Sequence, residues 1–552
     1  TTLTLTASNH VNVNANVAAT GDTAGIAINP NTANGGEAAS GTGTFNLKSG
    51  AAITLSGANP SLAIAGTPYT VINSLGVPGD TSATTLQGMN GNLGGHYALG
   101  SDIDATATAG WNVGGGFTPV GSPGAAFTGA FDGLGHSVSN LAINQPGADY
   151  VGMFGSVAVG VAIRNVGLIG SSVSGRSVVG ALAGSNYGTI SNSRSSGTVS
   201  SGGPYVGGLV GYNYGTIDGN STSSTTVTSS SSHIGGLVGV NSGAINNAYA
   251  TGDVSASGPY VGGLLGWNNP SATISNAYAT GNVVGSGNAV GGLVGYNVSA
   301  TIDHSHASGT VSGSMAGGLV GINDHGTISN SYATGNVGGI SSDYVGGLVG
   351  YNAYSFVSDS YATGTVTGSG TNLGGLLGYS VGSTVTNSHF DVDLSTVNGQ
   401  SSFALYGLYH NQLQDWVSHG KTLNIADYGS SLPYDSVSGT YGIGSVQGLK
   451  DLQGFAEASG VRFRLTADLD LASLPGYYLP NFSATSLDGT GHSLANLNLN
   501  LPTTSGVGFI SNLASGSTVS NLSLTNVGVS GGSYVGALAG SNYGTISNSR
   551  SS

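Results

Sequence analysis

Two pairs of aspartates are the first candidates for chemistry in this sequence. Asp102 and Asp104 lie in "YALGSDIDA", and Asp468 and Asp470 lie in the related "FRLTADLDL". Alternate residues of a strand share one face, so each pair could bind Ca²⁺ or serve a polysaccharide lyase or hydrolase. Catalysis would also require cationic or aromatic side chains nearby to bind a substrate. We favour the alternative that these aspartates form turns by hydrogen-bonding the backbone.

Two other motifs could carry chemistry. "DHSH" (Asp303–His306) places His304 and His306 two residues apart, on one strand face, where they could hold a metal ion. Both occupy positions that Asn and Tyr fill in related segments, so variation within a repeat explains them. "GVSGG" (Gly528–Gly532) fits the G-x-S-x-G pattern of hydrolases, but no strand-to-helix context surrounds it. The sequence therefore predicts that the chain is not an enzyme, with no catalytic residue, metal site or cofactor.

Tyrosine is the more informative residue type, with 26 Tyr against 12 Phe and 3 Trp. One repeated position holds four tyrosines, with His306 among them, and these are the predicted ligand-binding residues: Tyr249, Tyr278, Tyr332 and Tyr361. A second position holds Tyr212, Trp267, Tyr296, Tyr351 and Tyr379. Aromatic rings at half-wet positions suit stacking against carbohydrate, and they equally suit a structural ladder along a sheet. A row of asparagines is predicted to be structural: Asn213, Asn241, Asn268, Asn297, Asn323 and Asn352.

These positions recur because the sequence repeats. Each unit contains a hexad like that of "YVGGLVGYNYGTI" (Tyr205–Ile217), and the first hexad glycines are 26–29 residues apart. Leucine stands two residues after this glycine in every unit. A period of this size is typical of a solenoid. The glycines are Gly180, Gly207, Gly235, Gly262, Gly291, Gly317, Gly346 and Gly374.

The second half of each unit predicts short strands. "GAINNAYATGDV" (Gly243–Val254) alternates larger and small residues with period two, and helix-forming Glu, Lys, Arg and Gln are nearly absent. One unit cannot bury its apolar face alone, whereas stacked units can, with every strand pairing to its copy about 4.8 Å away. We therefore expect an all-β fold, a right-handed parallel β-helix. Whether Val206 or Leu209 points inward is open.

The repeats form two larger blocks, since Phe131–Ser196 matches Leu487–Ser552 without a gap. Between the blocks, "NQLQDWVSHG" (Asn411–Gly420) predicts a short helix that ends at glycine. The chain stops inside a repeat, so we expect more residues beyond Ser552. The predicted divisions are shaft coils at 1–68, a repeat-introducing segment at 69–149, a repeat array at 150–390, an insertion or irregular segment at 391–440, a second introducing segment at 441–505 and the start of a second array at 506–552.

Composition excludes several classes of protein. Charged residues are 6% of the chain and the net charge is −14, so no cationic surface for nucleic acid is expected. The 39% hydrophobic content argues against disorder. There is no cysteine, which fits either a reducing compartment or export through a pore. No signal peptide is visible, and the most apolar stretch, Val151–Gly170, contains Arg164 and glycines, so no membrane span is predicted.

The repeat units resemble the GLUG repeats of large bacterial surface proteins. The segment "YALGSDIDA" followed by "FDGLGHSVSNL" (Phe131–Leu141) resembles the region that introduces such repeats. "LTLTASNHVNVNANVAATGD" (Leu3–Asp22) is similar to the β-helical shaft of filamentous-haemagglutinin-like adhesins. The resemblance implies a right-handed β-helix, two-partner secretion through an outer-membrane barrel partner, and a role in adhesion or biofilm matrix. Pseudomonad matrix adhesins that hold exopolysaccharide are similar in style. The secretion domain of that family is not found at the start of this chain.

These observations lead to one main hypothesis and two alternatives. We expect a secreted bacterial adhesin shaft, at the cell surface or in the extracellular matrix, that binds exopolysaccharide or host glycans. An enzyme, as a β-helical polysaccharide lyase or hydrolase, would instead need one unique charged cleft that breaks the repeat. A passive spacer would carry its binding sites outside this sequence.

Overall fold

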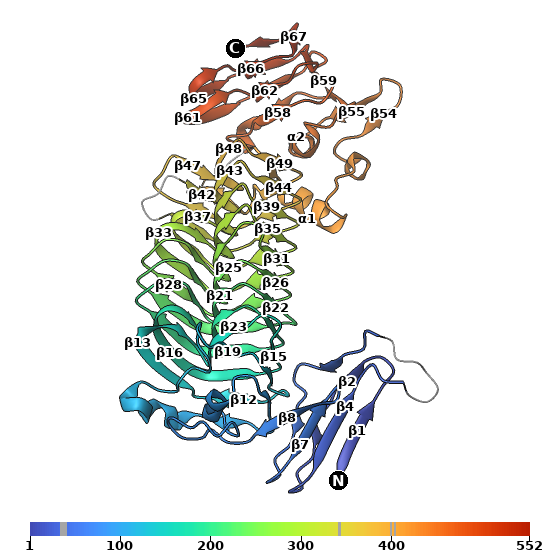
Figure 1. The fold of residues 1–552 in the computed structure, drawn as a ribbon. Coiled ribbons are helices and arrows are strands. Elements are labelled where there is room, and N and C mark those ends of the chain that lie inside the picture. The colour runs from blue at the N-terminus through green and yellow to red at the C-terminus, as the bar shows by residue number, and fades with distance from the viewer. Residues whose placement is uncertain (34–40, 340–343, 398–399, 402–404) are drawn as a thin grey trace.

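The chain folds into a β-solenoid of about 17 turns, with 50% of residues in strands and 8% in helices. This is a computed structural model that describes residues 1–33, 41–339, 344–397, 400–401 and 405–552. The rod extends from the first repeat coils to the second block, with the amino-terminal strands beside its base (Figure 1). The predicted all-β, parallel β-helical fold is confirmed. No helix among the described residues is long and apolar enough to cross a membrane.

Each coil of the repeat array contributes strands to three sheets, of 15, 25 and 9 strands. A representative coil contains β20 (Val206–Gly207), β21 (Val210–Asn213), β22 (Thr216–Asp218) and β23 (Thr222–Ser229). From β14 (Phe154–Val157) to β50 (His389–Asp391), the described strands pair only in parallel. Parallel pairing at a constant period places identical repeat positions side by side along the rod.

The hexad glycines follow this rule. Gly207 pairs with Gly235, and the same register continues from Gly180 to Gly374. The predicted stacking of the hexads is therefore confirmed. A Cβ added to Gly207 would lie 2.1 Å from the carbonyl oxygen of Val210 and 2.7 Å from that of Leu237 in the next coil. Only glycine allows the backbone to come this close.

The structure also shows which apolar residues of the hexad region point inward. Val206 and Leu209 are both fully buried. The chain turns between them, because β20 ends at Gly207 in one sheet and β21 begins at Val210 in another. Both positions therefore face the interior from different walls of the coil, which alternation within a single strand would forbid.

The amino-terminal strands join the rod through one reversal of strand direction. Strands β1 (Thr2–Thr6), β4 (Gly25–Asn29) and β7 (Ser61–Ile64) are parallel to one another. A tight turn at Ala65 and Gly66, both with positive φ, then makes β8 (Thr67–Ile72) antiparallel to β7. Because β8 is parallel to β9 (His96–Leu99), the sheet stays continuous while the strand direction reverses.

Helices and a hairpin lie between the two blocks of coils. Helix α1 (His410–Ser418) confirms the predicted short helix, with Leu413 and Trp416 buried against the rod and Val417 exposed. A hairpin of β54 (Tyr434–Asp435) and β55 (Thr440–Ile443) and helix α2 (Val446–Leu452) follow.

The second block repeats the architecture of the first. Strands β59 (Ser486–Asp488), β63 (Thr518–Ser520) and β67 (Thr545–Ser547) pair in parallel. They lie 356 positions after the corresponding strands β11 (Ala130–Asp132), β15 (Ala162–Arg164) and β18 (Thr189–Ser191), which also pair in parallel. The sequence duplication is therefore a duplication of coils.

Candidate functional site

The four predicted tyrosines form one continuous stack of rings. Tyr249, Tyr278, Tyr332 and Tyr361, with His306, occupy one register of β27 (Tyr249–Ala250), β32 (Tyr278–Ala279), β36 (His306–Ala307), β40 (Tyr332–Ala333) and β45 (Tyr361–Ala362). Neighbouring ring centroids are 4.6–5.0 Å apart and the planes are tilted by 3–10°. We call these five residues the ladder.

The ladder lies on the outside of the rod but does not offer its ring faces. All five side chains are half-buried, and each inner ring is covered on both faces by its neighbours. Burial raises the pKa of Tyr361 to about 12, so its hydroxyl stays protonated. A ligand would meet ring edges and hydroxyl groups here, which suits hydrogen bonding to sugars better than face stacking.

A second group of aromatic residues covers an adjacent part of the rod. It joins three residues of the second predicted register to residues before and after the hexad, and we call it the aromatic patch: Tyr187, Tyr205, Tyr212, Tyr214, His233, Tyr260, Trp267 and Tyr296. Neighbouring centroids are 4.1–5.9 Å apart without a break. Tyr187 and Tyr214 are 41% and 43% exposed, so this surface is open to a ligand. Tyr214 is stacked between Tyr187 and Tyr212, so it offers the edge of its ring. The other two residues of the second predicted register, Tyr351 and Tyr379, stack on each other in a separate group.

Three members of the patch hold an unusual backbone conformation. Tyr205, His233 and Tyr260 precede the hexads of successive coils and have φ of 67°, 63° and 65°. This left-handed region suits glycine and disfavours bulky residues. At another corner of the coils the chain uses asparagine, which tolerates positive φ: Asn192, Asn220, Asn247, Asn276 and Asn330. The patch corner is also left-handed at Val178, Ala289 and Met315 in other coils, so this conformation belongs to the fold and does not require an aromatic residue.

Polar groups accompany the aromatic patch. Asn269 Nδ2 donates to Tyr212 Oη over 2.9 Å and to Ser242 Oγ over 2.7 Å. Tyr296 Oη donates to a carboxylate oxygen of Asp324 over 2.9 Å. Burial lowers the pKa of His233 to about 4, so its imidazole is neutral at neutral pH. The patch thus combines flat apolar rings with hydrogen-bonding groups and carries little charge, a composition suited to neutral carbohydrate.

The aspartate pairs serve as connections between coils. Asp102 Oδ1 accepts hydrogen bonds from Ser137 N and Oγ, and Asp468 accepts the same pair from Ser493. Asp104 accepts from the backbone of Thr106, two residues on.

The second copy matches the first, because Asp470 accepts from Ala472 N and from Asn496 Nδ2. Hydrogen bonds from Ser493 hold the pKa of Asp468 below its usual range. The interpretation as turn residues that bind their own backbone is confirmed for Asp104 and Asp470, whereas Asp102 and Asp468 bind a serine of the next coil instead.

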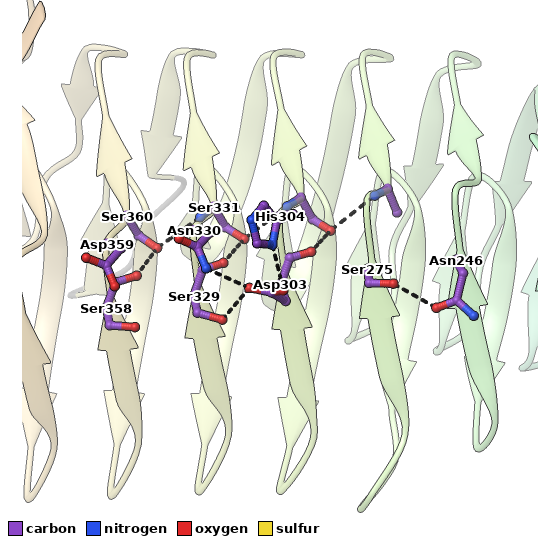
Figure 2. A network of polar contacts seen from close by, with 12 residues as sticks. Asn246, Ser275, Asp303, His304, Ser329, Asn330, Ser331, Ser358, Asp359 and Ser360 are labelled. Carbon is purple, nitrogen blue, oxygen red and sulfur yellow. Dashed lines mark hydrogen bonds and ion pairs between the residues drawn. The ribbon is translucent and has the colours of Figure 1, made fainter. Parts of the chain in front are cut away.

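The histidines of "DHSH" do not converge. Asp303 ends β35 (Thr301–Asp303) in one sheet and His306 begins β36 in another, so the interpretation that His304 and His306 share a strand face is wrong. Figure 2 shows His304 at the corner between these strands, with its Nδ1 2.6 Å from Asp303. The neighbouring coil supplies Ser329 and Asn330, which also donate to Asp303.

The remaining motif also lacks the geometry of a reactive site. "GVSGG" lies within β65 (Gly528–Val535), a strand that leads into no helix. In the part of the chain that the structure describes, no group of three or more His, Cys, Asp or Glu side chains could hold a metal ion.

Sequence reasoning missed several members of the aromatic patch. Tyr205 and Tyr260 stand just before the hexad, and Tyr187 and Tyr214 stand just after it, so a count by repeat position could have found them. The left-handed backbone of Tyr205 and Tyr260, and the contacts of Tyr260 with Trp267 and of Tyr214 with Tyr212, required the structure.

The parallel coils, their period and the repeated hexads define a β-solenoid repeat protein. Its array consists in part of GLUG motifs: the family model described as "The GLUG motif" matches residues 230–255, 257–284, 286–312, 312–338 and 341–367. The predicted resemblance to GLUG repeats is confirmed. The finer resemblance to two-partner-secreted adhesins stays a prediction.

Two relatives share part of the sequence. The chain is 41% identical over 191 residues to halomucin of Haloquadratum walsbyi, which is 34% of this chain. It is 39% identical over 101 residues, 18% of this chain, to a protein of Evansella cellulosilytica provisionally named a Gly-rich membrane protein. The matches span only 2% and 12% of the lengths of these relatives.

One solved structure aligns with much of the chain, that of a protein of Bacteroides ovatus provisionally described as an immunoglobulin A1 protease. The alignment covers 68% of this chain and 91% of the other, at 19% identity and a TM-score of 0.33. That similarity is too low to bear on the fold or function of this chain.

Proposed function

We propose that this chain is a non-catalytic segment of a bacterial surface adhesin, and that its rod binds polysaccharide through aromatic side chains. The GLUG motifs and the shared sequence with halomucin and with a provisionally named membrane protein support a surface repeat protein. Exopolysaccharide or host-surface glycan is the proposed ligand. Secretion through an outer-membrane barrel partner is the proposed route of export.

One observation carries the proposal of glycan binding. Successive coils place Tyr205, His233 and Tyr260 in a backbone conformation that glycine would adopt without strain. Each ring adds to a continuous aromatic surface that includes the exposed Tyr187 and Tyr214. Other coils place Val178, Ala289 and Met315 at this corner, so the fold does not need an aromatic residue there, and three aromatic rings in succession fit a binding surface.

The rigid rod allows several weak aromatic contacts to act together on one polysaccharide. An aromatic contact contributes about 0.5–1.5 kcal/mol, so a single ring would hold a glycan poorly. Rings fixed at coil spacing on a rigid rod bind one chain at several points, and linked contacts can exceed a single affinity by about 10²-fold or more. The ladder could add hydrogen bonds from its tyrosine edges to the same polysaccharide.

The two alternatives, an enzyme and a passive spacer, would require different features of the structure. A lyase or hydrolase needs converging carboxylates, whereas the conspicuous pairs at Asp102/Asp104 and Asp468/Asp470 hold the coils together. A passive spacer would not need aromatic residues at a corner that Val178, Ala289 and Met315 fill in other coils. Both alternatives predict that the aromatic patch is dispensable for retention on polysaccharide.

The test is a pull-down with purified bacterial exopolysaccharide and the whole chain. We expect the double variant Tyr187→Ala/Tyr214→Ala to lose at least tenfold in retention, and the fourfold ladder variant at Tyr249, Tyr278, Tyr332 and Tyr361 to lose less. Tyr434→Ala, at a 58% exposed tyrosine outside both surfaces, is the control. Retention should change little with salt because neither surface depends on ion pairs. Equal retention by all folded variants would reject the proposal in favour of a spacer.

A further inference from the structure

The second block contains a glutamine whose counterpart in the first block is fully hydrogen-bonded. "LQGM" (Leu86–Met89) and "LQGF" (Leu452–Phe455) begin the equivalent short 3-10 helices η1 (Gln87–Gly91) and η4 (Gln453–Phe455). Gln87 is buried, its Nε2 donates to Thr118 O over 3.1 Å, and its Oε1 accepts from Thr118 N over 3.0 Å. The amide of Gln87 therefore ties two segments of the coil together.

Gln453 has lost that partner. Its Oε1 is buried and accepts no hydrogen bond from any described residue. Leaving a buried carbonyl oxygen unsatisfied costs folding free energy, so such atoms are uncommon in native proteins. The first block shows that the fold can satisfy this glutamine, and the second block leaves it available.

Gln453 lines a cleft of about 710 Å³ where the repeat is interrupted. The walls come from the last coils of the first array, from α1 and from the start of the second block, and they include His389, Trp416, Glu457 and Asn481. The volume lies within the range of small-ligand sites, and junctions between folding units are common places for them. The cleft lies at the interruption of the repeat, where residues need not match the equivalent residues of other coils.

A second unsatisfied atom belongs to the same cleft. His389 continues the register of the ladder, and its ring lies edge-on to Trp416 at 5.0 Å. Its Nδ1 is buried and has no hydrogen-bond partner among the described residues. Burial lowers the pKa of His389 to about 4, although the backbone carbonyl of Tyr406 acts in the opposite direction. The imidazole is therefore neutral at neutral pH. A neutral imidazole both donates and accepts.

The polar groups of the cleft select the chemistry of its occupant. Gln453 Oε1 and the Glu457 carboxylate are acceptors, and none of the described residues lining the cleft is Lys or Arg. An anionic ligand would find no counter-charge there. A ligand rich in hydroxyl donors would satisfy the acceptors and His389 together, after the small side-chain rotations that expose the buried atoms.

We propose that this cleft between the two blocks binds one saccharide unit through its hydroxyl groups, with Gln453 and His389 as the main hydrogen-bonding residues. The choice of a saccharide rests on the proposed function, whereas the site itself rests on the cleft and its unsatisfied atoms. The aromatic patch would hold a polysaccharide along the rod, and this cleft would hold a single unit at one place.

The proposal is tested by titration calorimetry of the whole chain with cellobiose, maltose, lactose and N,N′-diacetylchitobiose. We expect at least one disaccharide to bind with 1:1 stoichiometry. Gln453→Met should weaken that binding at least tenfold without lowering the melting temperature, because it removes an unsatisfied oxygen. The matched control is Gln87→Met, which should lower the melting temperature and leave the affinity unchanged. Glu457→Gln, at an exposed position, tests the same cleft if Gln453→Met does not fold, and it should weaken binding severalfold.

The outcomes separate this site from the aromatic patch. Tyr187→Ala/Tyr214→Ala should leave disaccharide affinity unchanged, even where it abolishes retention on exopolysaccharide. Absence of 1:1 binding by all four disaccharides overturns the proposal. Wild-type affinity in the cleft variants also overturns it, as does an equal loss of melting temperature in Gln453→Met and Gln87→Met, since Gln453 would then be a structural residue satisfied by ordered water.

Discussion

Asn241 donates a hydrogen bond through Nδ2 to Oδ1 of Asn268 over 3.0 Å, and both side chains are fully buried. The same bond, at 2.8–3.0 Å, links the asparagines of successive coils: Asn186, Asn213, Asn241, Asn268, Asn297, Asn323 and Asn352. Each inner amide thus donates to the next coil and accepts from the previous one. The row predicted to be structural is confirmed as a buried ladder.

Asn268→Ala should break this ladder at its centre. Asn297 Oδ1 would lose its donor and Asn241 Nδ2 would lose its acceptor in the next coil. We expect a loss of about 1–3 kcal/mol in the free energy of unfolding, as for other buried groups left unsatisfied. Urea denaturation measures the loss, and Asn288→Ala at an exposed position is the control. Equal stability of the two variants would show that water replaces the ladder.

The coil period and its register could be predicted because they depend on local features that repeat. Each hexad needs glycine where two backbones meet, so the glycine spacing reports the coil length directly. The duplication of the introducing segment likewise appears in both sequence and strands. Short helix α1 was predictable from Leu413 and Trp416, which face the rod together.

Other features could not be predicted, because they depend on contacts that the repeat pattern does not encode. The reversal of strand direction at Ala65 and Gly66 arises from one tight turn between otherwise similar coils. The unsatisfied oxygen of Gln453 depends on the loss of a partner elsewhere in the chain. His304 and His306 looked like neighbours on a strand because the corner between them is made by ordinary residues rather than by glycine. Sequence periodicity cannot resolve such tertiary differences between copies.

Leu264→Asp should destabilise several coils at once. Leu264 is fully buried in the main hydrophobic core, so the variant places an unpaired carboxylate in an apolar interior. We expect a loss of several kcal/mol, shared by adjacent coils because each coil is stabilised by its neighbours. Thermal melting together with amide hydrogen exchange along the array measures both effects. Ser255→Asp, at an exposed position, should melt like the wild type, and an unchanged melting curve for Leu264→Asp would contradict the assigned core.

His233 should make the array sensitive to acid. Burial lowers its pKa to about 4 in the folded chain, against about 6.5 when unfolded. Above pH 6.5 both states are neutral at this residue. Between pH 6.5 and 4 only the unfolded state binds the proton, so folding stability decreases as the pH falls through this window.

His233→Tyr should remove that part of the pH dependence. Tyrosine occupies the equivalent corner in Tyr205 and Tyr260 with similar φ, so the variant fits the backbone. The difference in stability between wild type and variant should change by about 1–3 kcal/mol from pH 7 to pH 4, reduced by partial exposure of the ring. Denaturation at several pH values measures it, with an exposed-histidine variant, His10→Asn, as the reference. A difference that is constant with pH would mean that the folded state also protonates His233.

Calcium should have no effect on stability. One carboxylate oxygen of each aspartate in the pairs Asp102/Asp104 and Asp468/Asp470 already accepts hydrogen bonds from the protein. Calcium requires about 6–8 oxygen ligands, far more than two carboxylates provide. We expect the same melting temperature in EGTA and in millimolar CaCl₂. A rise in melting temperature with calcium that disappears in Asp102→Asn would reveal a site that these contacts do not predict.

The ladder should be stabilised by contact between its rings, and its two kinds of position allow a direct test. Tyr278 is stacked on both sides, against Tyr249 at 4.6 Å and His306 at 5.0 Å. Tyr249 is stacked on one side only, because its other neighbour in the register is Thr222. Each stacking contact contributes about 0.5–1.5 kcal/mol, so Tyr278→Ala should destabilise the array by about that much more than Tyr249→Ala. Denaturation of both variants measures the difference. Equal losses would mean that burial of each ring against its own strand, rather than stacking between coils, accounts for the tyrosines.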